Sequence, residues 1–190
     1  MEMNNDWLVM DLQGLVDATP YKEEPAQYFE REDCPIIKGG LSTARYGHPA
    51  FKKLHNEVRH KLQAVLGERL YPTYYFDRFY FHNTRMTRHT DREACEISVS
   101  LNISHNLKTP WPIFFDVHGE HIECYTEPGD GVLYKGIEVP HWREFMVGEE
   151  GSYFHQIFLH YVRADGYYLE FAYDQGSHLD QFTHEIPPPK

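Results

Sequence analysis

The clearest pattern of apolar positions in the chain lies between Gly47 and Gly67. Apolar residues recur there at offsets of three and four, as they do along one face of an α-helix. These positions are Phe51, Leu54, Val58, Leu62 and Val65. Pro49 suits the first turn of a helix, and Gly67 suits its end. The pattern predicts a helix over 49–66 whose single apolar stripe must pack on another element.

From Tyr71 onward the spacing of apolar residues changes to that of β-strands. Residues 95–103 (CEISVSLNI) alternate strictly between apolar and polar side chains, so that the two kinds occupy opposite faces. Turn-forming residues, such as those of the segment 128–131 (PGDG), separate it from other short strands. We expect these strands at 73–81, 86–89, 111–116, 121–126, 131–135, 143–147 and 152–162. About eight short strands at regular spacing predict a barrel or a sandwich.

The 190 residues are expected to form one domain. Residues 1–47, which contain three prolines, are expected to be an irregular leader with one packed strand or short helix. The predicted helix at 49–66 would support a barrel core formed by residues 71–163. Residues 164–190 would be a C-terminal extension. Its proline-rich end, HEIPPPK, has no apolar partner and is expected to be extended and mobile.

Composition narrows the classes of partner and compartment. The formal net charge is −11, which disfavours loose binding to nucleic acid or to an anionic membrane. Three cysteines without C-x-x-C spacing argue against a disulfide framework and against a structural zinc site. We see no signal peptide and no apolar run near the ~18 residues of a spanning helix. The expectation is a cytoplasmic protein with no nucleic-acid and no membrane partner; the oligomeric state stays open.

Metal-binding chemistry is suggested by His89-Thr90-Asp91 together with His141. In an extended segment, residues i and i+2 point the same way, so His89 and Asp91 can reach one ion. His141 follows fifty residues later, after a turn and a short strand. Two histidines and one carboxylate leave three positions of a metal open, which is the ligand set of non-haem iron(II) oxygenases. The other spaced pair, His118 and His121, is expected to be a solvated hairpin turn around Gly119.

A series of motifs resembles the 2-oxoglutarate/iron(II) dioxygenases, and within them the prolyl 4-hydroxylase-like branch is most similar. The series reads R-x-Y at 78–80, H-x-D at 89–91, an L-N strand, P-G-D-G-x-L-x-x-G at 128–136, and then His141. The resemblance implies a double-stranded β-helix, which is a jelly roll or cupin-like barrel, with the metal in its open end. It also implies that iron(II) is bound by His89, Asp91 and His141.

The same resemblance implies the co-substrates and the reaction. Tyr80 would hydrogen-bond 2-oxoglutarate, which is consumed with O2, and ascorbate would support turnover. An unactivated C–H bond of the substrate would be hydroxylated, with release of succinate and CO2. A fold and a metal site do not name the substrate. A prolyl residue, another peptidyl group and a small molecule all remain open.

The chain departs from the family where 2-oxoglutarate is anchored. The family usually places a lysine or arginine about ten residues after the distal histidine, but residues 144–162 contain neither. Arg143 could point to the same side as His141 and hold the far carboxylate with two hydrogen bonds. Its alternative role is a rim arginine paired with Glu144 or another carboxylate. Other candidates for this site are two cations and three neutral side chains: Lys135, Arg92, His155, Gln156 and Asn102.

Two other classes of protein remain as alternatives. The stretch PGDGVLYKGIEVPH also resembles the second conserved stretch of cupins, which would make the chain an isomerase, a dioxygenase without 2-oxoglutarate, or a sugar-binding module. Cupins usually supply an H-x-H pair and a glutamate in their first stretch, whereas this chain has His89-Thr90-Asp91, which favours the oxygenase. A non-catalytic barrel used for protein interaction is disfavoured because all three ligands are intact.

Overall fold

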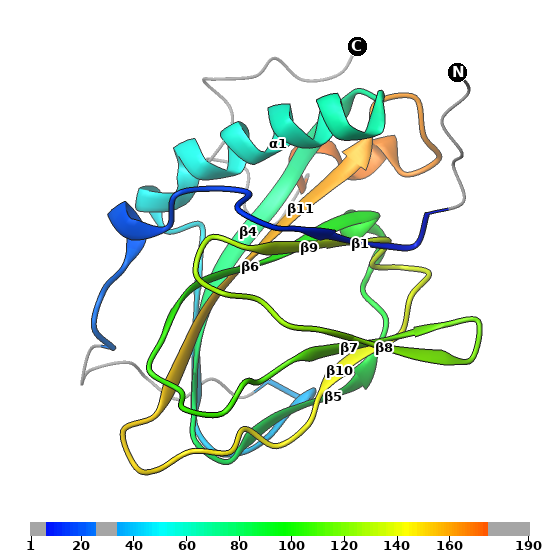
Figure 1. The fold of residues 1–190 in the computed structure, drawn as a ribbon. Coiled ribbons are helices and arrows are strands. Elements are labelled where there is room, and N and C mark those ends of the chain that lie inside the picture. Colours follow the sequence, from blue (N-terminus) through cyan, green and yellow to red (C-terminus); the bar gives the residue numbers. More distant parts are fainter. Residues whose placement is uncertain (1–6, 26–33, 175–190) are drawn as a thin grey trace.

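The protein consists of two antiparallel sheets that face each other, with one long helix on the outside (Figure 1). The computed structural model describes residues 7–25 and 34–174. In spatial order, the larger sheet contains β1 (Val9–Leu12), β9 (Gly131–Tyr134), β6 (Ile97–His105), β11 (Tyr153–Arg163), β4 (Leu70–Phe81) and β3 (Ser42–Tyr46). The smaller sheet contains β2 (Ile37–Gly39), β5 (Thr84–His89), β10 (His141–Arg143), β7 (Ile113–Val117) and β8 (Glu120–Cys124).

Strands β4 to β11 confirm the predicted jelly roll of about eight strands. Successive strands pass between the two sheets, so that β9, β6, β11 and β4 face β5, β10, β7 and β8. The strand expected at 143–147 is wrong in its bounds. The observed strand, β10, covers His141–Arg143 and ends there. Beyond it, Met146 accepts a main-chain hydrogen bond from Asn83, in the turn between β4 and β5, and donates one to Thr84, the first residue of β5.

The helix α1 (Lys52–Leu66), preceded by the short helix η2 (Pro49–Phe51), confirms the helix predicted at 49–66. Gly67 ends it in the left-handed conformation, and its N–H donates to the carbonyl of Gln63 at 2.9 Å. The buried stripe packs on the outer face of the larger sheet (Figure 1). The expected position Val65 is 41% exposed, whereas Leu66 is buried, because the stripe continues from Leu62 by four residues.

The alternation in β6 is confirmed, and its two faces have unexpected surroundings. Its apolar residues lie in the core cluster beneath α1, outside the barrel. Its polar residues Ser98, Ser100 and Asn102 point into the space between the sheets and are nevertheless buried. The interior of the barrel is therefore lined in part by hydroxyl and amide groups. Such a lining suits a polar ligand better than a purely hydrophobic lining would.

The segment before Gly47 is more regular than expected. It contains β1, which pairs with β9, β3, which pairs with β4, and β2, which pairs with β5, so each sheet is extended at an edge. Strands of three to five residues carry too little periodicity to be recognised without their partners. The short helices η1 (Thr19–Tyr21), η3 (Glu93–Cys95) and η4 (Leu169–Asp174) complete the described elements. The proline-rich end of the chain lies outside the described residues.

Three other expectations concern the cysteines, membrane-spanning helices and the histidine pair at 118 and 121. Cys34, Cys95 and Cys124 are free thiols. Within residues 7–25 and 34–174, no helix has the length and apolar character required to cross a bilayer. The pair His118 and His121 lies at the hairpin between β7 (Ile113–Val117) and β8 (Glu120–Cys124), as expected.

Candidate metal centre

Three predicted metal ligands meet at one end of the barrel. His89 is the last residue of β5, His141 is the first residue of β10, and the two are direct partners across the smaller sheet. Asp91 lies just beyond β5. The Nε2 atoms of His89 and His141 lie 3.6 and 3.5 Å from the same oxygen, Oδ1 of Asp91. Antiparallel pairing thus brings together His89 and His141, which are 52 residues apart in the sequence.

Main-chain carbonyls determine which ring nitrogen of each histidine faces the centre. Nδ1 of His89 lies 2.7 Å from the carbonyl oxygen of Thr87, and Nδ1 of His141 lies 2.9 Å from that of Val139. A carbonyl can only accept, so Nδ1 carries the proton of the neutral ring and Nε2 keeps its lone pair. Such outer partners are typical of metal-ligating histidines. Both lone pairs are directed at the Asp91 carboxylate.

Asp91 supplies the negative charge of the cluster. Burial raises the pKa of Asp91, but His141 and His89 lower it by more, so that the pKa lies well below its ordinary range. The group is therefore a carboxylate at neutral pH. Its second oxygen, Oδ2, is buried and has no hydrogen-bond partner among the described residues. Two imidazole lone pairs and one carboxylate converge here, and none of these groups has a proton to donate to the others. This donor set fits a divalent metal with open positions.

The three side chains open into a cavity of about 260 Å³. Aromatic rings of β3, β4 and β11 form one wall of it, and Phe76 stacks between Tyr46 and Phe158 at centroid distances of 4.9 and 4.7 Å. The charged residues that line it are Asp91, Arg78 and Arg92. A small cavity with an apolar wall and a few convergent polar groups is typical of a ligand site.

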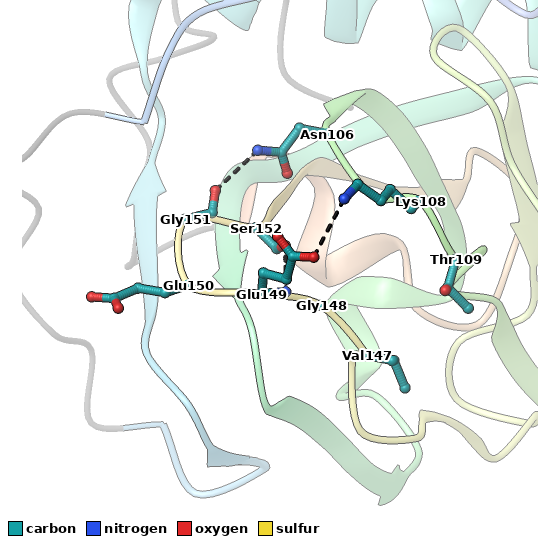
Figure 2. A pocket seen from close by; sticks show the side chains of 9 residues that line it. All are labelled: Asn106, Lys108, Thr109, Val147, Gly148, Glu149, Glu150, Gly151 and Ser152. Carbon is teal, nitrogen blue, oxygen red and sulfur yellow. Dashed lines mark hydrogen bonds and ion pairs between the residues drawn. The ribbon is translucent and has the colours of Figure 1, made fainter.

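A larger hollow on the surface lacks comparable chemistry (Figure 2). It measures about 420 Å³ and lies between the loop after β6 and the loop between β10 and β11. Asn106 donates to the carbonyl of Gly151 at 3.0 Å, and Lys108 lies 3.3 Å from Glu149 (Figure 2). The side chains of this ion pair are 86% and 84% exposed, so water screens them and the pair contributes little.

Arg143, the predicted anchor of 2-oxoglutarate, points into the barrel and is 1% exposed. Its Nη2 donates to Oε1 of Gln156 at 2.9 Å, and its Nη1 donates to the carbonyl of Trp111. The guanidinium carbon lies 4.6 Å from the ring of Trp111 and 4.8 Å from that of Phe154. Burial lowers the pKa of Arg143 to about 10, so the group stays cationic at neutral pH.

The alternative role of Arg143, a rim arginine paired with Glu144, is wrong. Glu144 is exposed, and its carboxylate accepts a hydrogen bond from Nε1 of Trp142 at 3.0 Å. The arginine instead points into the barrel, because two residues along an extended strand return the side chain to the face of His141.

The neutral residues predicted for the co-substrate site lie on the inner face of the larger sheet. Tyr80 is fully buried, its ring packs edge-on against Trp111 at 5.1 Å, and its hydroxyl lies 3.9 Å from Sδ of Met86. Gln156 is the direct strand partner of Asn102. The amide of Asn102 donates to the carbonyl of Thr126 at 2.7 Å, whereas that of Gln156 donates to Ser100. Gln156 therefore contacts Arg143, and Asn102 turns toward a loop.

Two other candidates lie away from the cavity, whose lining also does not include Arg143, Gln156 or Asn102. His155 is on the opposite face of β11, where its Nε2 lies 2.8 Å from Oδ2 of Asp77 and its ring stacks on Phe79 at 3.9 Å. Adjacent residues of a strand point to opposite faces, so His155 cannot join Gln156. Lys135 lies 3.8 Å from Glu138 and does not line the cavity. Neither residue therefore lines the cavity into which the three predicted ligands open.

Arg92 does line the cavity, but its guanidinium contacts Asp174 and the ring of Tyr74. Its guanidinium lies 2.8 Å from Oδ2 of Asp174 and 4.6 Å from the centre of the Tyr74 ring. His160 also lines the cavity, and its Nδ1 lies 2.8 Å from Oγ of Ser98.

Arg78 was missed as a cavity residue. It is the first residue of the R-x-Y motif, lines the cavity and is 3% exposed. Its strand partner across β11 is Gln156. A signal was present in the sequence, since Arg78 and Tyr80 are two apart in a strand and must share a face.

No protein-family model and no curated protein matches the sequence. Solved structures match the fold. A non-haem alpha-ketoglutarate-dependent epimerase, SnoN from nogalamycin biosynthesis, has a TM-score of 0.62 at 11% identity, over 82% of this chain and 78% of that one. A Pseudomonas putida prolyl-4-hydroxylase has a TM-score of 0.57 at 14% identity, over 82% and 92%.

HygX from Streptomyces hygroscopicus, solved with nickel and 2-oxoglutarate bound, has a TM-score of 0.57 at 8% identity, over 80% of this chain and 82% of that one. At these identities the likeness concerns the fold. The chain has the double-stranded β-helix that 2-oxoglutarate/iron(II) oxygenases share, prolyl hydroxylases among them.

Proposed function

We propose that the chain is an iron(II)- and 2-oxoglutarate-dependent oxygenase whose metal is held by His89, Asp91 and His141. The observation that carries the proposal is the convergence of two Nε2 lone pairs on Oδ1 of Asp91, at 3.6 and 3.5 Å, with each Nδ1 held by a carbonyl. The shared fold supports it, because HygX was solved with a metal and 2-oxoglutarate. Three ligands on one side leave room for a co-substrate and O2.

The co-substrate would lie between the metal and Arg143. The guanidinium is buried and cationic, and it can give the far carboxylate of 2-oxoglutarate two hydrogen bonds in place of those to Gln156 and Trp111. Tyr80 would donate its hydroxyl proton to the same molecule, and Gln156 and Asn102 would supply neutral hydrogen bonds. Aromatic rings around Arg143 exclude water and so strengthen these contacts.

The reaction would insert one oxygen atom into a C–H bond. Bound iron and 2-oxoglutarate supply the oxidising chemistry: R–H, 2-oxoglutarate and O2 become R–OH, succinate and CO2. Ascorbate would support turnover, and the protein would act in the cytoplasm. The substrate would be a prolyl group, another peptidyl group or a small molecule, in keeping with a solved neighbour that is a prolyl-4-hydroxylase.

The metal and co-substrate can be tested together by spectroscopy. Anaerobic addition of iron(II) and 2-oxoglutarate should produce the weak visible charge-transfer band of a chelate at an open iron site. The variants His89→Ala and Asp91→Ala should lose the band. His121→Ala, which changes an exposed histidine at a hairpin, is the matched control and should keep it. A wild-type-like band in either ligand variant would contradict the proposal.

A cupin-type enzyme or sugar-binding module is the second candidate, because the turn and strand before His141 also resemble a cupin stretch. Succinate release separates the two. An oxygenase of the proposed kind consumes 2-oxoglutarate, so metal-dependent turnover that needs no 2-oxoglutarate would favour the cupin.

A further inference from the structure

A second group of possible ligands lies behind the proposed metal centre and shares Asp91 with it. The carboxylate of Asp91, the thiol of Cys95 and the imidazole of His160 each offer one atom, and these three atoms lie within 4.8 Å of one another. Cys95 and His160 are 2% exposed. None of the contacts described for the first centre uses Cys95 or His160.

The two oxygens of Asp91 have different surroundings. Oδ1 is the atom approached by His89 and His141. Oδ2 is buried and has no hydrogen-bond partner among the described residues, and the same holds for Nε2 of His160. A buried polar atom that makes no hydrogen bond has lost its hydration without compensation, which destabilises the fold. Two such atoms in one small group indicate that something else occupies the space between them.

The hydrogen bonds around His160 determine its tautomer. Ser98 donates its hydroxyl proton to the carbonyl of Cys95 at 3.1 Å, so its oxygen is left to accept from Nδ1 of His160 at 2.8 Å. Nδ1 therefore carries the ring proton, and Nε2 presents a lone pair. The arrangement matches that of His89 and His141, with a hydroxyl oxygen in the place of a carbonyl. A lone pair and a carboxylate oxygen repel each other unless a cation lies between them.

We propose that Asp91, Cys95 and His160 form a second metal site, next to the first and bridged to it by the Asp91 carboxylate. The proposal rests on the proposed function, because it takes Asp91 as a ligand of the first metal. One sulfur, one nitrogen and one oxygen ligand suit a zinc-like divalent ion, which binds thiolate, imidazole and carboxylate in tetrahedral sites. Three protein ligands leave a fourth position for water or a ligand.

The geometry requires modest side-chain movement. With metal–ligand distances of about 2.0–2.3 Å, tetrahedral coordination places ligand atoms about 3.3–3.8 Å apart. The ligand atoms of the second group, which lie within 4.8 Å of one another, must move closer together to reach these spacings. Cys95 Sγ, which lies 3.2 Å from the hydroxyl of Tyr74, would lose its proton on binding.

A third grouping, Glu23, Asp77 and His155, does not compete as a site. Arg45 already forms ion pairs with both of its carboxylates, and Asp77 also holds His155. The cation that this grouping requires is therefore a side chain of the protein itself.

Cobalt(II) is a suitable probe of the second site, because a cobalt–thiolate bond gives a strong near-ultraviolet charge-transfer band. The full chain, freed of metal with a chelator, should bind two equivalents of cobalt(II) and develop this band. Cys95→Ser should lose the band and bind one equivalent. His160→Gln should also bind one equivalent. Cys124→Ser, which changes a buried thiol in another cluster, should behave like the wild type.

The outcomes separate this inference from the proposed function. A single equivalent of cobalt without a thiolate band in the wild type would overturn the second site, even if iron(II) and 2-oxoglutarate still give their visible band. His89→Ala should lose the visible band yet keep the thiolate band. Circular dichroism on each variant shows whether it is folded. If Cys95→Ser does not fold, the loss of one equivalent in folded His160→Gln remains decisive.

Discussion

The main-chain N–H of Asp91 donates to the carbonyl of Gly136 at 2.9 Å, which joins the loop after β5 to the turn before β10. A methyl group added to Gly136 would lie 2.6 Å from Oδ2 of Asp91 and 2.4 Å from the carbonyl oxygen of Cys95. Glycine therefore allows the two loops to approach each other, and the last glycine of the P-G-D-G-x-L-x-x-G motif has a direct role in positioning Asp91, a proposed metal ligand.

The first prediction concerns this close approach. Gly136→Ala should lower the affinity for iron(II) about 10-fold or more, as loss of an outer contact to a metal ligand does. It should also destabilise the fold by about 1–3 kcal/mol, because the carbonyl of Cys95 cannot move aside. Calorimetric titration of the metal measures the first effect. Gly119→Ala, at an open hairpin with φ near +87°, should cost stability only. Equal metal affinities in both variants would contradict the role of Gly136.

The second prediction concerns the anchor. Arg143→Gln should weaken 2-oxoglutarate binding about 100-fold, because it removes two charge-assisted hydrogen bonds, and it should leave iron(II) affinity unchanged. Titration of the visible band with 2-oxoglutarate measures the effect. Arg88→Gln, which breaks an exposed ion pair with Asp116, is the control. Undiminished co-substrate affinity in Arg143→Gln would transfer the role to a cavity arginine, Arg78 or Arg92.

The third prediction concerns the supporting helix. Leu62 is fully buried between α1 and the larger sheet. Leu62→Ala should lower the free energy of unfolding by about 2–5 kcal/mol, because it removes buried methyl groups and leaves a cavity. Urea unfolding measures the change. Val65→Ala, on the same helix and 41% exposed, should have a much smaller effect. Similar losses in the two variants would show that α1 does not bury Leu62 as described.

The fourth prediction concerns pH. Burial lowers the pKa of His55 from 6.5 to about 3. Between these values the unfolded chain binds a proton that the folded chain does not, so folding is weakened as the pH falls below 6.5. One such group contributes a slope of about 1.4 kcal/mol per pH unit. His55→Gln should therefore show a shallower fall in unfolding free energy between pH 6.5 and 5 than the wild type.

His121→Gln, which changes an exposed histidine, is the control for this effect and should retain the wild-type slope. Urea unfolding at several pH values measures all three proteins. If the wild type and His55→Gln lose stability in parallel, His55 is protonated in the folded state, and its buried neutral form is excluded.

Local periodicity was sufficient to predict several features. The helix at 49–66, the alternation in β6 and the shared direction of His89 and Asp91 all follow from the geometry of a single element. The same rule placed Arg143 on the side of His141. These features do not depend on which distant residues pack against the element, so the sequence determined them by itself.

Only the tertiary structure decided which faces meet. Pairing across the sheets sets His89 opposite His141, turns the polar face of β6 inward and separates His155 from Gln156. It also brings Arg78 into the cavity opposite Gln156. A periodic pattern shows that two faces of a strand differ, but not which of them is the interior. That choice depends on contacts between distant residues, whose register arises from the packing of the whole barrel.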